Sequence, residues 1–224
     1  GARFVQIYGQ GECPMTITVL PRDLVADRAH PNADARRGSV GFAQAGVQVR
    51  VVDSDMRPLP ADEVGEVVVS GDALMKGYWG NEEATADTVV DGWLRTGDLG
   101  SMDADGFLTL TDRSKDVIIS GGTNIYPREV EETLLAHENV SEVSVIGVPS
   151  PEWGEDVVAF VVATGDGRCD APQLDAWCKS RMASFKKPKK YHFVQDLPKN
   201  SYGKVLKTSL RERIAQELEG EHQA

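Results

Sequence analysis

The order of apolar and polar residues divides the chain into two parts. Up to about residue 111, short apolar runs such as 47–52 and 65–69 are separated by Gly, Pro and Asp, which is typical of strands joined by turns. From Asp116 onward, the pattern predicts helices that alternate with strands over 143–148, 157–163 and 191–194. We therefore predict an α/β fold of the α+β kind, mostly β in its first part and mixed in its second.

Three segments of the second part have the spacing and end signals of helices. The first begins at Pro127, a favoured early helix position, and places Val130 and Leu134 four residues apart. The second follows Asp170, a residue type that caps helices, and the last begins near Ser209. The apolar stripes of all three are expected to pack in the core and to carry no function.

Composition limits the class of protein. The chain has 224 residues, 41% of them hydrophobic, which suffices for one domain or two small ones with a buried core. The longest apolar run, 157–163, falls far short of the ~20 residues that cross a bilayer, so no membrane span is expected. Residues 1–5 lack the pattern of a signal peptide, which predicts a cytoplasmic location. Cys13, Cys169 and Cys178 lack the spacing of zinc or redox motifs and are expected to pack as small apolar residues.

Charge is distributed unevenly along the chain. The 24 basic and 35 acidic residues give a net charge of −11, which disfavours binding to nucleic acid or to an anionic membrane surface. One stretch near the end is nevertheless rich in lysine, with Lys186, Lys187, Lys189, Lys190, Lys199, Lys204 and Lys207. Such a run is usually a solvated face, and the alternative is a site for a small ligand that carries phosphate.

Four short segments have residue types that suit a ligand site. In Tyr-Gly-Gln-Gly-Glu at 8–12, glycines beside an aromatic residue and an acid let the backbone approach a ligand closely. Trp-Leu-Arg-Thr-Gly-Asp at 93–98 is expected to place a carboxylate on a tight turn, either to grip the hydroxyls of a ribose or as a plain surface turn. Ser-Gly-Gly-Thr-Asn at 120–124 either opens space for a ligand or forms a loop before the helix. In 198–207, Lys204 follows a glycine in a loop and is a mobile point charge.

Taken in this order, the four segments resemble the adenylate-forming superfamily of acyl-CoA synthetases, luciferases and peptide-synthetase adenylation domains. Connecting segments fit the same superfamily, namely 65–71, 75–79, 146–149 and Trp-Gly-Glu at 153–155. The resemblance covers the whole chain. It implies that residues 1–112 are the β-rich end of a large N-terminal domain and that 117–224 form a small mobile α/β C-terminal domain. Between them, 113–116 would be the hinge, with Lys115 at its centre. On local sequence alone, a plain hairpin turn explains this polar segment equally well.

The resemblance also implies roles for residues of the first part. Tyr8, with Gly9, would lie against the adenine of ATP, and Glu12 would help to hold Mg²⁺. Asp98 and Arg113 would bind the ribose hydroxyls.

For the second part, the resemblance implies roles in both half-reactions. Lys204 would sit at the reacting α-phosphate and carboxylate. Gly121 and Gly122 would line the path of the pantetheine arm of coenzyme A, while Lys186 and Lys187 would meet its phosphates.

The activity implied is that of an AMP-forming acid–CoA ligase, which activates a fatty or aromatic carboxylate with ATP and transfers it to coenzyme A. Its partners would be a small carboxylic acid, ATP and coenzyme A, and no nucleic acid is expected among them. The resemblance also allows a homodimer of the full-length enzyme. Two alternatives stay open. One is an adenylating enzyme with another acceptor, such as a luciferase-like enzyme or a carrier-protein ligase. The other is a non-catalytic nucleotide-binding module.

Two departures from the superfamily affect these expectations. Gly11 stands where the superfamily usually has a threonine, whose hydroxyl touches the phosphate or metal region. The Ser/Thr/Gly-rich phosphate loop that the superfamily carries upstream is not in the sequence, and most of the acyl pocket would lie upstream too. The 224-residue chain by itself is therefore expected to be inactive.

Overall fold

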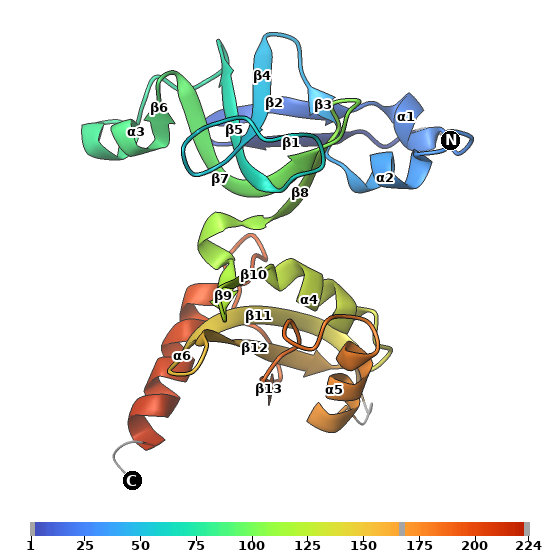
Figure 1. Cartoon of the computed structure of the whole chain (residues 1–224), viewed down its shortest axis with the longest axis vertical. Coiled ribbons are helices and arrows are strands. Elements are labelled where there is room, and N and C mark those ends of the chain that lie inside the picture. Colours follow the sequence, from blue (N-terminus) through green and yellow to red (C-terminus); the bar gives the residue numbers. More distant parts are fainter. Residues whose placement is uncertain (1–2, 166–168, 222–224) are drawn as a thin grey trace. The chain divides into compact units, whose positions relative to one another are not determined.

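The computed structural model describes residues 3–165 and 169–221, and the chain divides into two compact units, Gly1–Lys115 and Asp116–Ala224 (Figure 1). Gly1 and Ala2, which belong to the segment considered above for a signal peptide, lie outside the described residues. Strands and helices both occur, so the predicted α/β class is confirmed. In the part of the chain that the structure describes, no helix is long and apolar enough to cross a membrane.

The first unit contains two antiparallel sheets. One has the order β1-β2-β3, with β1 (Gln6–Gln10), β2 (Cys13–Leu20) and β3 (Phe42–Ala43). The other has the order β4-β5-β7-β6, with β8 paired to β7. Its strands are β4 (Val47–Val52), β5 (Gly65–Gly71), β6 (Val89–Val90), β7 (Trp93–Met102) and β8 (Leu108–Arg113). The two apolar runs predicted as strands are thus confirmed as β4 and β5.

A single core joins the strands of the first unit. Side chains alternate across a strand, and Val67 and Val69, which share one face of β5, are fully buried in this core, while Val68 on the other face is buried as well. Tyr8 from β1 and Leu94 from β7 belong to the same cluster. Cys13 is also buried in it, as expected for a small apolar residue, and the three cysteines of the chain are free.

Three short helices interrupt the described part of the first unit, residues 3–115, and were not predicted. They are α1 (Arg22–Ala26), α2 (Ala33–Gly38) and α3 (Glu82–Thr88). Helices of this length hold too few turns to show a 3.6-residue period in the sequence. The clearest local signal is at α3, where the Asn81 side chain accepts a hydrogen bond from the N–H of Ala84 at 3.0 Å.

After β8, a short 3-10 turn, η1 (Ser114–Asp116), leads into the second unit. Here the sheet has the order β10-β9-β12-β11, and β13 pairs with β12 in parallel. The strands are β9 (Ile118–Ser120), β10 (Thr123–Ile125), β11 (Val140–Ser150), β12 (Gly154–Ala163) and β13 (Lys190–Phe193). The helices are α4 (Pro127–Leu135), α5 (Ala171–Lys179) and α6 (Lys207–Glu221).

Helices cover both faces of this sheet. On one face, α4 and α5 pack against alternate residues of β11 and β12, including Val145 and Val157. On the other face, α6 packs through Leu210 and Ile214 against the intervening residues, such as Phe160. Because both faces are buried, 157–163 of β12 is a continuous apolar run, and β11 has adjacent apolar residues at Val145 and Ile146.

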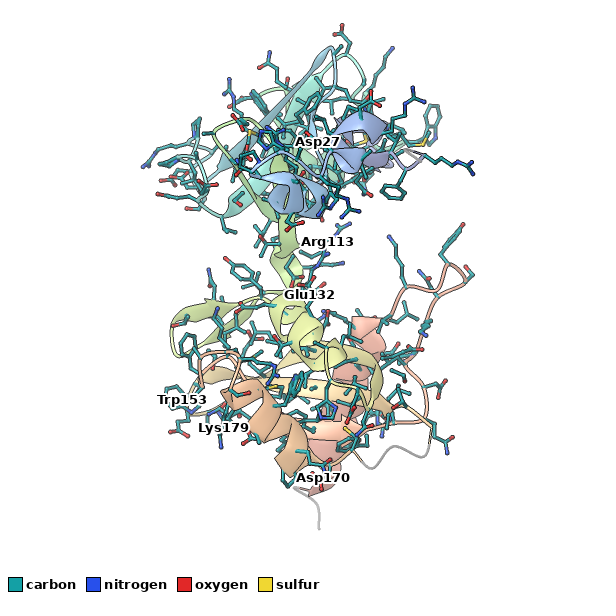
Figure 2. All side chains as sticks on the ribbon, turned by 90° about the vertical axis from the view of Figure 1, so that its right-hand side faces the viewer. Asp27, Arg113, Glu132, Trp153, Asp170 and Lys179 are labelled. Carbon is teal, nitrogen blue, oxygen red and sulfur yellow. The ribbon has the colours of Figure 1, made fainter. Side chains whose placement is uncertain are left out.

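The predicted helix starts are largely confirmed. Helix α4 begins at Pro127, and its Val130 and Leu134 are fully buried. Helix α5 begins after Asp170 (labelled in Figure 2), whose side chain accepts a hydrogen bond from the N–H of Gln173 at 2.9 Å. Helix α6 begins at Lys207, two residues earlier than the signal at Ser209 indicated.

Candidate functional site

The carboxylate of Asp98 is the centre of a polar network in the first unit. The hydroxyl of Tyr8 and the amide nitrogen Nε2 of Gln10 both donate to its Oδ2, each at 2.6 Å. The Nε of Arg113 forms an ion pair with its Oδ1 at 2.8 Å. Asp98 is only 8% exposed, and a buried carboxylate is costly unless its oxygens are paired. The three donors meet that requirement. Tyr8 and Arg113, which like Asp98 were predicted to bind the nucleotide, therefore both contact this carboxylate.

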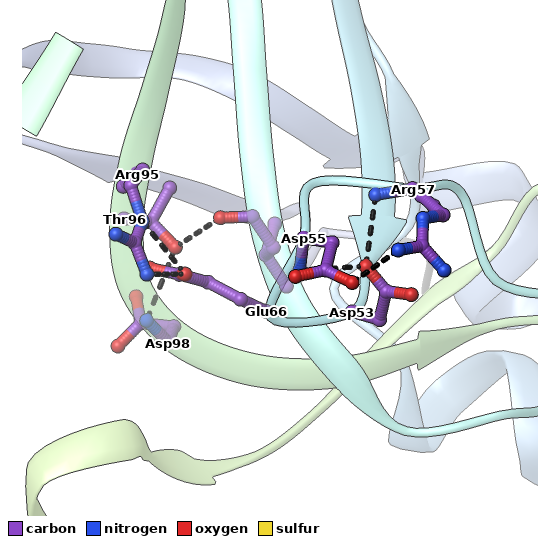
Figure 3. A network of polar contacts seen from close by, with 8 residues as sticks. Asp53, Asp55, Arg57, Glu66, Arg95, Thr96 and Asp98 are labelled. Carbon is purple, nitrogen blue, oxygen red and sulfur yellow. Dashed lines mark hydrogen bonds and ion pairs between the residues drawn. The ribbon is translucent and has the colours of Figure 1, made fainter. Parts of the chain in front are cut away.

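Asp98 lies within a strand, so the predicted tight turn at this residue was wrong. It is in β7, directly opposite Arg113 of β8. The glycine that suggested a turn, Gly97, has a φ of +67°, which distorts the strand without ending it. The hydroxyl of Thr96 accepts a hydrogen bond from the N–H of Asp98 at 3.1 Å and donates to the carbonyl of Val67 at 2.7 Å (Figure 3). The carboxylate is therefore held on a rigid sheet.

Tyr8 is fixed at both ends of its side chain. Its ring belongs to the core of the first unit, and its hydroxyl reaches Asp98. Burial, and next the hydrogen bond to Asp98, raise the pKa of Tyr8 well above its ordinary value. The hydroxyl therefore stays protonated at neutral pH and acts as a donor to the carboxylate.

Gln10 is a site residue that the sequence analysis missed. Its Nε2 donates to Asp98 and also to the carbonyl of Thr96 at 2.9 Å, so the amide connects β1 to β7. Tyr8 and Gln10 are two residues apart in β1, and this spacing was the available signal that both side chains face one side.

We expect Gln10→Glu to destabilise the first unit because it places a second carboxylate beside Asp98. Two carboxylates that share a site raise the pKa of one of them, so the loss should be about 2 kcal/mol or more at pH 7 and should shrink towards pH 4. The control, Gln10→Leu, removes the hydrogen bonds without adding charge and should cost about 1 kcal/mol at both pH values. Urea unfolding followed through the NMR amide signals of β7 measures both. If Gln10→Glu lowers the urea midpoint below that of wild type by the same amount at pH 4 and pH 7, the contact is contradicted.

Glu12 lies on the two-residue turn between β1 and β2. The Tyr78 hydroxyl donates to its Oε1 at 2.6 Å, and this hydrogen bond, followed by burial, raises the pKa of Tyr78. Within residues 3–165 and 169–221, no group of three or more His, Cys, Asp or Glu residues is placed to hold a metal ion. Mg²⁺ is commonly bound by one or two carboxylates together with substrate phosphates, and the single carboxylate of Glu12 fits that kind of site.

The two glycines of this hairpin differ in their surroundings. A Cβ on Gly9 would lie 2.3 Å from the backbone nitrogen of Met15, so close packing within the hairpin requires glycine there. Packing within the hairpin therefore explains the glycine at position 9 without any ligand. A Cβ on Gly11 would meet nothing within 4 Å, so the threonine that the superfamily usually has would fit at this position.

Gly121 and Gly122 form the tip of the β9–β10 hairpin in the second unit. Their φ angles of +58° and +76° are the left-handed values of a tight two-residue turn, which favours glycine. A Cβ on Gly121 would lie 3.0 Å from the Trp153 ring, whereas a Cβ on Gly122 would meet nothing within 4 Å. Trp153 (labelled in Figure 2) is 43% exposed, and the ammonium of Lys189 lies 5.5 Å from the centre of its ring. The turn therefore has an open side next to an exposed aromatic residue.

The structure divides the seven clustered lysines into two groups. Four form ion pairs within the second unit, namely Lys186 with Glu129, Lys187 with Asp175, Lys199 with Glu142 and Lys207 with Glu131. Lys186 and Lys187 must therefore leave these carboxylates before they can meet a phosphate. Among the described residues, Lys189, Lys190 and Lys204 have no carboxylate within ion-pair distance.

Lys204 combines a fixed backbone with a free side chain. The Asn200 side chain accepts hydrogen bonds from the N–H groups of Tyr202 and Lys204, both at 3.0 Å. The N–H of Asn200 donates to the carbonyl of Lys204 at 2.9 Å, and Gly203 has a φ of +80°. The ammonium is thus carried by an ordered loop and remains exposed. A cation on a fixed backbone, without an ion-pair partner among the described residues, suits electrostatic stabilisation of a negatively charged ligand.

Lys115 is the last residue of the first unit and lies within η1. Asp116, the first residue of the second unit, is paired with Arg211 at 2.9 Å. The hinge role of Lys115 stays a prediction.

Comparisons with known proteins agree over most of the chain. Residues 129–204 match the family described as the AMP-binding enzyme C-terminal domain, and residues 1–79 match the AMP-binding enzyme family. Feruloyl-CoA synthase from an Amycolatopsis species is 45% identical over 214 residues, which are 96% of this chain and 42% of that protein. The long-chain-fatty-acid–CoA ligase of Bacillus subtilis is 46% identical over 223 residues, 99% of this chain and 38% of that protein.

A solved structure also resembles this chain over most of its length. The crystal structure of ATP-bound MatB from Rhodopseudomonas palustris has a TM-score of 0.84 at 39% identity, covering 93% of this chain and 40% of that one. The chain thus spans about two fifths of the length of the curated relatives it matches.

Proposed function

Because the chain belongs to the AMP-binding enzyme family, we propose that it is part of an AMP-forming acid–CoA ligase. The observation that carries the proposal is the buried Asp98 carboxylate, which Arg113 and Tyr8 hold on β7. A fixed carboxylate beside an arginine suits the two hydroxyls of a ribose. The relatives are named for the thioesters of feruloyl and long-chain fatty acids, which supports a fatty or aromatic acid as the substrate.

In the first half-reaction, an oxygen of the substrate carboxylate forms a bond to the α-phosphorus of ATP while the bond to pyrophosphate breaks. Asp98 would position the ribose, and Tyr8 would lie against the adenine. Both reacting partners are anions, so the ammonium of Lys204 would lower the barrier by compensating the charge on the carboxylate and the α-phosphate. Mg²⁺ held by Glu12 and the ATP phosphates would add charge compensation there.

In the second half-reaction, the thiol of coenzyme A gives up its proton to solvent, its thiolate sulfur forms a bond to the acyl carbon, and AMP leaves with the electrons of the broken bond. The open side of the Gly121–Gly122 turn would border the path of the pantetheine arm, because a glycine backbone lets a chain-like ligand pass closely. We expect a rotation about Lys115 between the two half-reactions, since Lys204 serves only the first of them.

We expect the 224-residue chain alone to form no acyl-CoA, because the phosphate loop of the family and most of the acyl pocket are not in its sequence. A polypeptide of the relatives' length that contains this chain, called the full-length enzyme below, should form it. Both are tested with ATP, Mg²⁺, coenzyme A and a panel of fatty and aromatic acids, and thioester formation is measured. Turnover by the isolated chain would contradict the claim that part of the active site lies outside these 224 residues. Failure of the full-length enzyme with every acid would contradict the proposed function.

A further inference from the structure

The β9–β10 hairpin is attached to the sheet of the second unit by few backbone contacts. Its base is anchored by Ile118 and Ile125, which are both fully buried. Nearer the tip, β9 and β12 share a single paired position, Ser120 with Gly154. The N–H of Gly121 also donates to the carbonyl of Trp153 at 2.8 Å.

A side chain supplies the additional link. The carboxylate Oε2 of Glu155 accepts a hydrogen bond from the backbone N–H of Ile119 at 2.7 Å. In the antiparallel register set by Ser120 and Gly154, Glu155 lies opposite Ile119, and its carboxylate accepts the hydrogen bond that a backbone carbonyl of β12 would accept in a regular ladder. The side chain of Ile119 is 55% exposed, so burial does not hold this part of the hairpin in place.

Gly147 makes room for that carboxylate. It lies on β11 opposite Val157, so Glu155 is its diagonal neighbour across the two strands. A Cβ on Gly147 would lie 2.7 Å from Oε1 of Glu155 and 2.9 Å from its Cδ. The φ of Gly147 is outside the left-handed region, so its backbone conformation does not require glycine. Space for Glu155 is therefore the reason for glycine at this position.

We propose that Glu155 is a positioning residue that holds the Gly121–Gly122 turn in the geometry the second half-reaction requires, and that Gly147 permits it. The proposal rests on the proposed function, because it takes the turn as a border of the coenzyme A path. It also gives a physical role to two segments that otherwise only supported the resemblance, 146–149 and 153–155.

Two changes displace the contact in different ways. Glu155→Ala removes the acceptor, and Gly147→Ala keeps Glu155 but puts a methyl group where its carboxylate lies. In the full-length enzyme, each should slow transfer from pre-formed acyl-adenylate to coenzyme A by about tenfold, because small misplacements at a reacting centre are costly. Acid-dependent pyrophosphate exchange, which reports the first half-reaction, should stay within about twofold of wild type. Glu155→Gln keeps an oxygen acceptor and should recover most of the transfer rate.

The contact itself is measured by amide hydrogen exchange. The Ile119 amide should exchange about tenfold faster in Glu155→Ala and Gly147→Ala, while that of Ile125 at the base of the hairpin should not change. The double variant should be no slower in transfer than either single one, because both changes remove the same contact.

Each other outcome overturns the proposal. Unchanged exchange at Ile119 would show that Glu155 does not hold the hairpin. Faster exchange with an unchanged transfer rate would show that the held geometry does not matter to the reaction. Equal losses in both half-reactions would indicate a general loss of stability. Failure of the proposed function is recognised separately, because the unaltered full-length enzyme would then form no thioester with any acid.

Discussion

Lys204→Ala in the full-length enzyme should slow formation of the acyl-adenylate by about a hundredfold to a thousandfold, the effect of losing one preorganised group that stabilises developing charge, ~3–4 kcal/mol. Transfer from a supplied acyl-adenylate to coenzyme A should stay nearly unchanged. Lys204→Arg should restore little, because the planar guanidinium differs in reach and shape from an ammonium.

The structure distinguishes Lys204 from the four lysines of the cluster that form ion pairs. Its backbone is fixed through Asn200, and no carboxylate among the described residues compensates its charge. Lys199 is a matched control in the same loop, since its ammonium is already paired with Glu142 at 2.6 Å. Loss of an exposed ion pair of this kind costs well under ~1 kcal/mol, so Lys199→Ala should change neither half-reaction by more than about threefold.

Pyrophosphate exchange and single-turnover transfer of pre-formed adenylate, run on the same folded variants, separate the outcomes. Equal losses in the two assays, or no loss in the first, would show that Lys204 is not the adenylation lysine. A similar loss in Lys199→Ala would indicate that the order of the loop matters more than the Lys204 ammonium.

Gly122→Leu should affect the two half-reactions in the opposite way to Lys204→Ala. We expect transfer to coenzyme A to fall by about a hundredfold, because a side chain on the open side of the turn would occupy the proposed path, while adenylation should fall much less. A non-glycine residue at a φ of +76° also carries a strain of about 1–2 kcal/mol, so a loss of stability has to be separated from a block.

Two controls achieve that separation. Gly122→Ala introduces nearly the same strain with little bulk, and its transfer rate should lie within about fivefold of wild type. Gly92→Leu is matched in backbone, because Gly92 has a φ of +79°, a Cβ there would meet nothing within 4 Å, and the residue lies in the first unit. It should leave transfer unchanged. If Gly122→Leu transfers the acyl group at the wild-type rate, the turn does not border the path.

The elements that the sequence predicted well are those with a strong local cause. Pro127 and Asp170 mark the starts of α4 and α5 because a proline and a capping carboxylate act within one helical turn. The apolar run of β12 is continuous because helices cover both faces of the sheet, and the length and composition of 143–148 and 157–163 identify both as strands.

The parts that the sequence did not predict depend on contacts between distant residues. Glycine before Asp98 indicated a turn, but pairing with Arg113 keeps this segment in a strand. Gln10 reaches Asp98 from a different sheet, and Glu155 reaches Ile119 from the neighbouring strand, and no local pattern specifies either contact. The carboxylates that neutralise Lys186 and Lys187 come from α4 and α5, so the lysine run gave no sign that its charge is largely compensated.

The most direct test of the central claim is the stoichiometry of products in the full-length enzyme. With an accepted acid, ATP, Mg²⁺ and coenzyme A, we expect one AMP and one pyrophosphate for each thioester formed. Exchange of labelled pyrophosphate into ATP should depend on the acid but not on coenzyme A. Release of ADP and phosphate instead, or exchange that proceeds equally without the acid, would contradict an acyl-adenylate route.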